Sequence, residues 1–252
     1  MAGALNGQSA SERREALKEV FAQTQVCTRC AELAATRKTV VFGAGNADAD
    51  LMFVGEAPGA SEDEQGLPFV GRAGKLLDTL LGEIGLARSD VFVVNTLKCR
   101  PPGNRDPLPI EIDNCRDYLL RQVQLIEPVV ICSLGNFSTK LLRDDPTGIT
   151  RLHGQPEVLV LGGRALRLYP IYHPAAALYT PRMLETLRED FARLPELLAL
   201  GAPDQPSADL AADEAGLQEA RRAVELAHAD ESPPGLPEGV SEPAPADQLG
   251  LF

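Results

Sequence analysis

The stretch Leu51-Met52-Phe53-Val54-Gly55-Glu56-Ala57-Pro58-Gly59 joins an apolar run of strand length to a glycine-containing turn that carries a carboxylate. Three more apolar runs end in polar or glycine-rich segments, at 91–94, 129–132 and 168–172. Helical patterns occupy the intervening and flanking segments: 11–24, 73–84, 110–126, 136–142 and 181–200. This alternation predicts an α/β fold, a three-layer α/β/α sandwich with a central, mostly parallel four-stranded sheet. A hairpin is expected where 158–161 turns at Gly162-Gly163.

Charge is unevenly distributed along the 252 residues. Residues 201–252 contain eleven Asp or Glu and two Arg, a net −9 of the formal −12 of the whole chain. We therefore expect one folded domain over 1–200 and an acidic, largely disordered tail over 201–252, with a helix near 208–229. No apolar run approaches the roughly 20 residues that span a bilayer. With no secretory signal at the start, the chain is expected to be cytoplasmic.

Four cysteines in two groups form a candidate metal site: Cys27 and Cys30 in a CxxC motif, then Cys99 and Cys115. Four thiolates suit either a structural zinc ion or an iron-sulfur cluster, and the spacing does not choose between them. Unrelated core thiols are the alternative reading. Cys132 ends an apolar run, so we expect it to be a packed strand residue outside the site.

Polar side chains follow the predicted strands where each strand ends. Glu56 follows the first strand, Asn95 the second and His173 the last. Because the carboxyl ends of parallel strands meet at one edge of a sheet, a carboxylate, a carboxamide and an imidazole are expected to converge in one crevice. Each residue alone has an ordinary structural explanation, as a turn former or a core histidine. Their joint pattern favours a site.

These motifs resemble a known family. Gly55-Glu56-Ala57-Pro58-Gly59, residues 66–74, Asn95, Lys98-Cys99-Arg100-Pro101-Pro102 and His173-Pro174-Ala175 look like the bacterial family 4 uracil-DNA glycosylases, the iron-sulfur type. The resemblance covers roughly residues 15–200 and implies the uracil-DNA glycosylase fold. It also implies a role in base excision repair, with single- or double-stranded DNA that contains uracil as the substrate. The four cysteines would hold a 4Fe-4S cluster.

The resemblance also implies roles for individual residues. Phe69 would stack on the flipped uracil, Asn95 would pair with its N3 and O4 edge, and the Ala57 backbone N–H would donate to the base. His173 would stabilise negative charge on uracil O2 as the glycosidic bond breaks. In a related branch the position after Glu56 is an Asp that serves as the general base, but here it is Ala57. Glu56 is therefore the nearest candidate for orienting water.

Several positions leave alternatives open. Glu62 is either a wall that excludes the thymine methyl group or an exposed turn residue. The family's apolar DNA wedge corresponds to Ala177, so that role passes to Leu178 or Tyr179, with Leu178 taken first. His153 occupies a loop where a related branch bonds covalently to the sugar, which gives a uracil-DNA-crosslinking alternative.

The last five residues resemble the motif by which bacterial repair proteins bind the DNA sliding clamp. The residues that would bind it are Gln248, Leu249, Leu251 and Phe252. No membrane partner is expected, and the protein is expected to be a monomer. The competing function classes are an iron-sulfur electron carrier, which needs no polar crevice, and a nucleotide-binding module, whose phosphate loop is missing here.

Overall fold

A six-stranded sheet forms the middle layer of the structure, a computed structural model that describes residues 8–206. Its strands lie in the order β1-β3-β2-β4-β6-β5. They are β1 (Ala44–Gly45), β2 (Leu51–Gly55), β3 (Phe92–Asn95), β4 (Val130–Leu134), β5 (Glu157–Leu161) and β6 (Arg164–Ile171). The four inner strands run parallel, whereas β1 and β5 pair antiparallel at the edges. The predicted four parallel strands therefore form the centre of a mixed sheet that is extended by two edge strands.

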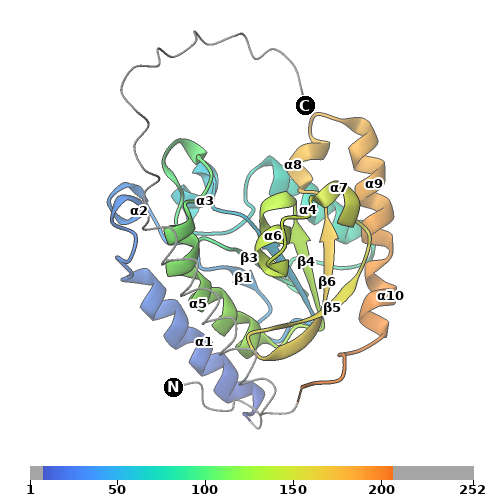
Figure 1. Ribbon diagram of the computed structural model, residues 1–252, viewed down its shortest axis with the longest axis horizontal. Helices are drawn as coiled ribbons and strands as arrows, with labels where there is room; N and C mark the ends of the chain where they lie inside the picture. Colours follow the sequence, from blue (N-terminus) through green and yellow to red (C-terminus); the bar gives the residue numbers. More distant parts are fainter. Residues whose placement is uncertain (1–7, 207–252) are drawn as a thin grey trace, which may run out of the picture. The chain divides into compact units, whose positions relative to one another are not determined.

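Alternate residues of β2 pack into apolar clusters on opposite faces of the sheet. Met52 and Val54 belong to a cluster shared with helices α1 and α5. Leu51 and Phe53 belong to a second cluster, shared with α4, α9 and α10. Figure 1 shows α1 and α5 beside each other on one side of the sheet and α9 and α10 on the other. Burial of both faces is typical of parallel sheets, and it confirms the predicted α/β/α layers.

The long helices lie where the sequence predicts them. They are α1 (Ala10–Gln25), α4 (Arg72–Glu83), α5 (Pro109–Ile126), α6 (Asn136–Arg143) and α9 (Pro181–Ala192). The prediction of one helix over 181–200 was wrong, because α10 (Leu194–Ala199) follows α9 as a separate helix. Pro195 lacks the N–H that would continue the α9 hydrogen-bond ladder, and its ring crowds the preceding turn.

Shorter helices were missed because four to six residues carry too little periodicity to recognise. They are α2 (Ala31–Thr36), α3 (Ala60–Gln65), α7 (Ile149–Leu152) and α8 (Pro174–Ala177), with a 3₁₀ turn at Pro102–Asn104. The predicted hairpin is present between β5 and β6. Gly162 and Gly163 have φ values of 61° and 78°, which a tight two-residue turn of this hand requires.

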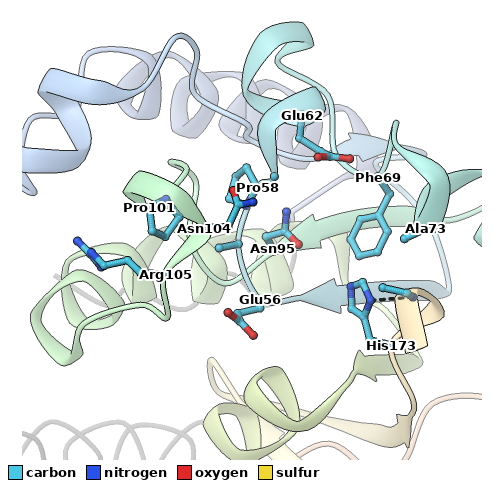
Figure 2. A pocket seen from close by; sticks show the side chains of 13 residues that line it. Glu56, Pro58, Glu62, Phe69, Ala73, Asn95, Pro101, Asn104, Arg105 and His173 are labelled. Atoms are coloured by element: carbon cyan, nitrogen blue, oxygen red, sulfur yellow. Dashed lines mark hydrogen bonds between the residues drawn. The ribbon is translucent and has the colours of Figure 1, made fainter. Parts of the chain in front are cut away.

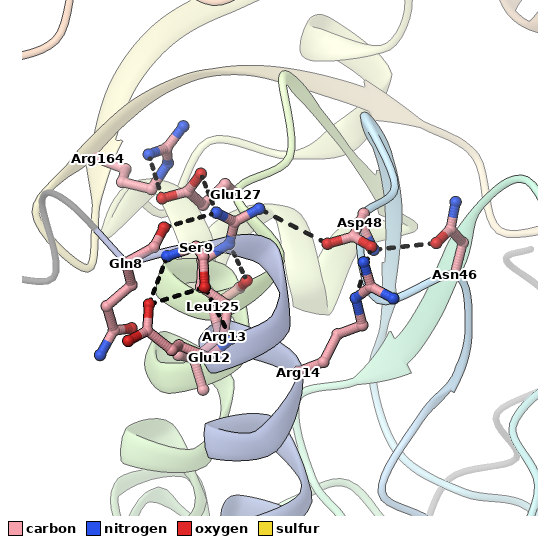
Figure 3. Close-up of polar contacts among 10 residues, drawn as sticks. All are labelled: Gln8, Ser9, Glu12, Arg13, Arg14, Asn46, Asp48, Leu125, Glu127 and Arg164. Atoms are coloured by element: carbon pink, nitrogen blue, oxygen red, sulfur yellow. Dashed lines mark hydrogen bonds and ion pairs between the residues drawn. The ribbon is translucent and has the colours of Figure 1, made fainter.

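A charged network fixes the start of α1 to the end of α5 (Figure 3). Arg13 Nε donates to the Leu125 carbonyl at 3.2 Å, and the guanidinium lies 3.6 Å from carboxylate oxygens of both Glu127 and Asp48. Because α1 leads directly to Cys27, this network also sets where the first cysteine group lies.

No helix among residues 8–206 is both long and apolar enough to cross a membrane. The helix expected over 208–229 and the C-terminal motif lie outside the described residues.

Candidate active site

The carboxyl ends of the parallel strands open onto a cavity of about 390 Å³ (Figure 2). Glu56 and Ala57 reach it from the end of β2, Asn95 from the end of β3 and His173 from the segment after β6. Phe69 reaches it from the loop before α4. The five residues that the sequence analysis assigned to the base and its chemistry thus line the same cavity.

A second wall of the cavity was not predicted. It is formed by Pro101, Asn104 and Arg105, in the loop that follows Cys99. The sequence signal for this wall is a candidate metal ligand, Cys99, that lies shortly after a predicted strand. Arg105 is not free, because its guanidinium binds the Glu111 carboxylate of α5 at 2.6 Å.

Asn95 lines the cavity and is only 2% exposed. Its backbone is paired with Gly55 of β2. A Cβ atom on Gly55 would lie 2.4 Å from Asn95 Oδ1 and 2.8 Å from Phe69 Cζ, so only glycine allows both groups to approach the strand so closely. The carboxamide and the aromatic ring therefore share one fixed corner.

Phe69 is held in an unusual backbone conformation, with φ of 54°. The Phe69 carbonyl packs against Gly74, where any Cβ would approach to 1.7 Å. Arg88 Nη2 donates to the adjacent Pro68 carbonyl at 2.6 Å. The Phe69 ring is stacked with the His173 imidazole, with 5.5 Å between centroids and 29° between planes. The loop thus fixes one flat wall of the cavity.

His173 is a neutral hydrogen-bond donor in this setting. Its Nδ1 accepts the backbone N–H of Ala175 at 3.1 Å, so the ring hydrogen of the neutral form lies on Nε2. Burial lowers the pKa of His173 to about 4, although Glu62 opposes this shift. At neutral pH the imidazole therefore carries no charge and offers an Nε2–H group.

Glu56 brings a carboxylate to the same cavity. Burial, and to a smaller extent the nearby Asp106, raises the pKa of Glu56 above its usual value. The main chain at Glu56 is fixed, because its carbonyl accepts from Leu97 N at 3.0 Å. A carboxylate in this position is suited to accept a hydrogen bond from water or to stabilise a nearby cation.

Glu62 also lines the cavity, but its carboxylate is already engaged. Its Oε1 accepts from the backbone N–H groups of Val70 and Gly71 at 3.0 and 3.1 Å. These bonds fix the loop that carries Phe69. The interpretation of Glu62 as a freely solvated turn residue is therefore wrong.

Cys27 packs against the cluster shared with α1 and α5, whereas the other three predicted metal-ligating cysteines lie at a separate apolar cluster. Cys30, Cys99 and Cys115 all contact this cluster, which includes Leu33 and Leu97. The Arg37 guanidinium connects two of the cysteines, because Nη2 donates to the Cys27 carbonyl at 2.8 Å and Nη1 is directed at Cys99 Sγ. None of the described cysteines forms a disulfide. Cys132, in contrast, is fully buried in β4, as expected of a packed strand residue.

Hydrogen-bond donors surround three of these sulfur atoms. Arg37 Nη1 lies 3.1 Å from Cys99 Sγ, the Lys98 backbone N–H 3.4 Å from Cys115 Sγ, and Asn114 Nδ2 3.5 Å from Cys30 Sγ. Burial raises the pKa of Cys115 to about 12. Among residues 8–206 no group of three His, Cys, Asp or Glu side chains is arranged to hold a single metal ion.

The surface segment after α8 carries the candidate DNA wedge. Ala177 is packed in the core, and Leu178 is half-buried at the end of α8. Tyr179 is 77% exposed, and the guanidinium of Arg72 lies 5.5 Å from its ring centroid. Tyr179 is therefore the more prominent side chain of the two candidates.

His153 does not line the cavity with the other candidates. Its Nδ1 lies 3.5 Å from the carboxylate of Asp190, and its ring packs on Tyr172 with centroids 4.5 Å apart. This arrangement gives His153 a packing role against α9 and offers no support for covalent attack on a sugar.

Comparison with known proteins gives consistent matches. The model of the uracil DNA glycosylase superfamily matches residues 42–196. A type-4 uracil-DNA glycosylase of Archaeoglobus fulgidus is 43% identical over 193 residues, which are 75% of this chain and 96% of that protein. Type-4 uracil-DNA glycosylases of Saccharolobus solfataricus and Thermotoga maritima are 45% and 43% identical over 70% and 65% of this chain, and over 84% and 83% of their own lengths.

Proposed function

Because this chain belongs to the type-4 uracil-DNA glycosylases of the uracil DNA glycosylase superfamily, we propose that Asn95, Phe69 and His173 are the groups by which it recognises and releases uracil. The chain is an enzyme that excises uracil from DNA. The observation that carries the residue assignment is the convergence of these three side chains in one cavity, next to the close approach that Gly55 permits.

Recognition of the base rests on the donor and acceptor pattern of Asn95. A flipped uracil offers an N3–H donor beside the O4 acceptor, and a carboxamide supplies the complementary acceptor and donor. Cytosine presents the reverse pattern, so the buried polar atoms of the base and of the Asn95 carboxamide would be left unpaired. The cavity therefore rejects cytosine. Phe69 stacks on the face of the base, and the Ala57 backbone N–H donates to its edge.

His173 assists departure of the base. As the bond between uracil N1 and the sugar C1′ breaks, the electron pair of that bond moves onto the base and its negative charge reaches O2. The neutral imidazole donates its Nε2–H to this oxygen, in a buried setting where such a bond is strong. Glu56 orients the water that adds to C1′ and stabilises the positive charge that develops on the sugar. The proton that this water releases passes through solvent to the uracil anion.

We further propose that Cys27, Cys30, Cys99 and Cys115 hold a 4Fe-4S cluster. The donor set fits this group: four thiols, with Arg37 and two N–H donors directed at three of their sulfur atoms. Each of the four cysteines would supply one thiolate ligand to the cluster. When bound, the cluster would cross-link α5 and the segments around Cys27 and Cys99, and thereby support the nearby 101–105 wall.

Contacts with DNA outside the cavity complete the proposal. Leu178 and Tyr179 are the wedge candidates, and the exposure of Tyr179 favours it for insertion into the duplex. The enzyme is proposed to act as a cytoplasmic monomer on single- and double-stranded DNA. Clamp binding by Gln248, Leu249, Leu251 and Phe252 stays a prediction from the sequence.

The test of the residue roles uses labelled oligonucleotides with a single uracil, cytosine or thymine. The wild-type protein, without added magnesium, should create alkali-sensitive breaks at uracil alone. Asn95→Ala and His173→Ala should each lower excision at least about 100-fold while keeping the thermal transition. His153→Ala is the matched control and should retain activity. Full activity of Asn95→Ala would contradict the assignment, and an alkali-independent band shift removed by His153→Ala would support the crosslinking alternative.

A further inference from the structure

Lys98 lies between the cysteine group and the uracil cavity. Its side chain is 1% exposed, and it immediately precedes Cys99 in the chain. Its ammonium donates to the backbone oxygen of Asn95 at 2.8 Å and to Gln122 Oε1 at 2.7 Å. Its own backbone N–H is directed at Cys115 Sγ, 3.4 Å away. A single residue therefore contacts both the end of β3 and the proposed metal centre.

An ammonium group buried this deeply is costly unless it is paired with negative charge. The lysines that form ion pairs in the described part of the chain are Lys18 and Lys38, and Lys98 is not among them. Its amine donates instead to two uncharged oxygens, the Asn95 carbonyl and Gln122 Oε1, and burial lowers the pKa of Lys98 to about 7. These two hydrogen bonds, and no ion pair among the described residues, hold the Lys98 side chain in place.

Gln122 fixes the direction of the Lys98 side chain. It is fully buried in α5, two turns after Cys115. Its Nε2 donates to the Phe42 carbonyl at 2.9 Å, so its Oε1 must face the ammonium. The amide cannot rotate without breaking both bonds, and the Lys98 ammonium is held at one place.

The bond from Lys98 to Asn95 satisfies a carbonyl where the strand ends. The next two residues return to β2 through other bonds: Thr96 N donates to the Gly55 carbonyl at 2.9 Å and Leu97 N to the Glu56 carbonyl at 3.0 Å. The Asn95 carbonyl is buried and receives the ammonium. Without that donor it would be a buried acceptor lacking its partner, which favours rotation of the strand end.

We propose that Lys98 is a positioning residue that couples the metal centre to uracil recognition: its backbone adjoins Cys99 and faces Cys115 Sγ, and its side chain fixes the backbone from which the Asn95 carboxamide meets the base. The inference rests on the proposed function, because it takes Cys99 and Cys115 as ligands and Asn95 as the group that binds uracil.

The test is Lys98→Met in the iron-loaded, full-length protein, with Lys18→Met, an exposed lysine on α1, as the matched control. Two quantities are measured: the Kd for free uracil and the midpoint potential of the cluster. Loss of a charge-assisted bond should weaken uracil binding about tenfold. Because Lys98 adjoins Cys99 and its backbone N–H faces Cys115 Sγ, the substitution should also shift the potential of the cluster. An unchanged uracil Kd or an unchanged potential in Lys98→Met would overturn the inference.

A double-mutant cycle separates positioning from general damage. In the Asn95→Ala background, Lys98→Met should cost little further kcat/KM, because the two residues act through one contact. Additive losses would mean that Lys98 is only structural. If Lys98→Met does not fold, Gln122→Met decides the question, with about threefold weaker uracil binding expected in folded, iron-containing protein. Normal uracil binding in Asn95→Ala would instead count against the proposed function itself.

Discussion

Replacement of Gly55 by alanine should abolish most uracil excision while the protein remains folded. Gly55 lies in the extended backbone of β2, which alanine adopts without strain. Its new methyl group, however, would lie 2.4 Å from Asn95 Oδ1 and 2.8 Å from Phe69 Cζ. Both atoms belong to groups that we assign to uracil binding, so the substitution acts directly on the recognition corner.

The expected magnitude follows from these distances. Non-bonded contacts settle near 3.5 Å, so the carboxamide and the ring must each retreat by about 1 Å. A displacement of that size at a binding group costs on the order of 100-fold in rate. Overpacking of a filled interior costs about 1–3 kcal/mol in the free energy of unfolding, which a folded domain of this size can tolerate. The loss of kcat/KM should therefore exceed what unfolding explains.

The assay compares kcat/KM on a single-uracil oligonucleotide with the thermal transition of each variant. Gly82→Ala is the matched control, because Gly82 lies in α4 and a Cβ there meets no atom within 4 Å. That control should keep its activity and gain about 0.5–1 kcal/mol in stability. The reasoning would be refuted if Gly55→Ala retained activity within about threefold, or if its loss merely followed the unfolded fraction.

Three further outcomes are expected. Because His173 has a pKa of about 4 and that of Glu56 is raised, kcat/KM should be constant at neutral pH and should fall on the acid side as Glu56 gains a proton. The part of this fall that lies above pH 4 should disappear in Glu56→Gln, and a limb near pH 6.5 that persists in this variant would argue for a protonated histidine. Cys115→Ala should lose iron and visible absorbance, and its Tm should fall by about 2–4 °C for each kcal/mol lost from the free energy of unfolding. Cys132→Ala should keep its iron, and equal iron contents in the two variants would count against the ligand assignment. Tyr179→Ala should reduce excision from duplex DNA more than from single strands, and equal losses would exclude a wedge role.

Sequence alone was sufficient for the parallel core and for residues at strand ends. Asn95 and His173 follow apolar runs, and the carboxyl ends of parallel strands share one edge, so their convergence required no knowledge of distant contacts. Phe69 is different. Its position depends on a backbone φ of 54° and on contacts with Gly74 and Arg88. The sequence around Phe69 does not indicate these features, so only the family resemblance suggested a role for it.

Lys98 shows a second limit of sequence reasoning. A lysine is normally assigned to the surface, and nothing local to Leu97-Lys98-Cys99 indicates that its ammonium is buried. The partner that makes burial possible, Gln122, lies on α5 and is recognisable only once that helix is packed against the strand end. Buried polar contacts of this kind depend on pairs of elements, whereas hydrophobic periodicity reports one element at a time.

The cysteine group and the cavity wall form one structural unit. Arg105 of that wall binds Glu32 and Glu111, each at 2.6 Å. Glu32 follows Cys30 by two residues and Glu111 precedes Cys115 by four, so the two carboxylates lie on the segments that the metal would hold together. Separation of those segments would release Arg105 and open the cavity. The sheet would stay packed, because the apolar clusters on its two faces do not depend on Arg105. The proposed metal centre would therefore contribute to catalysis through the shape of the cavity, even without a redox role.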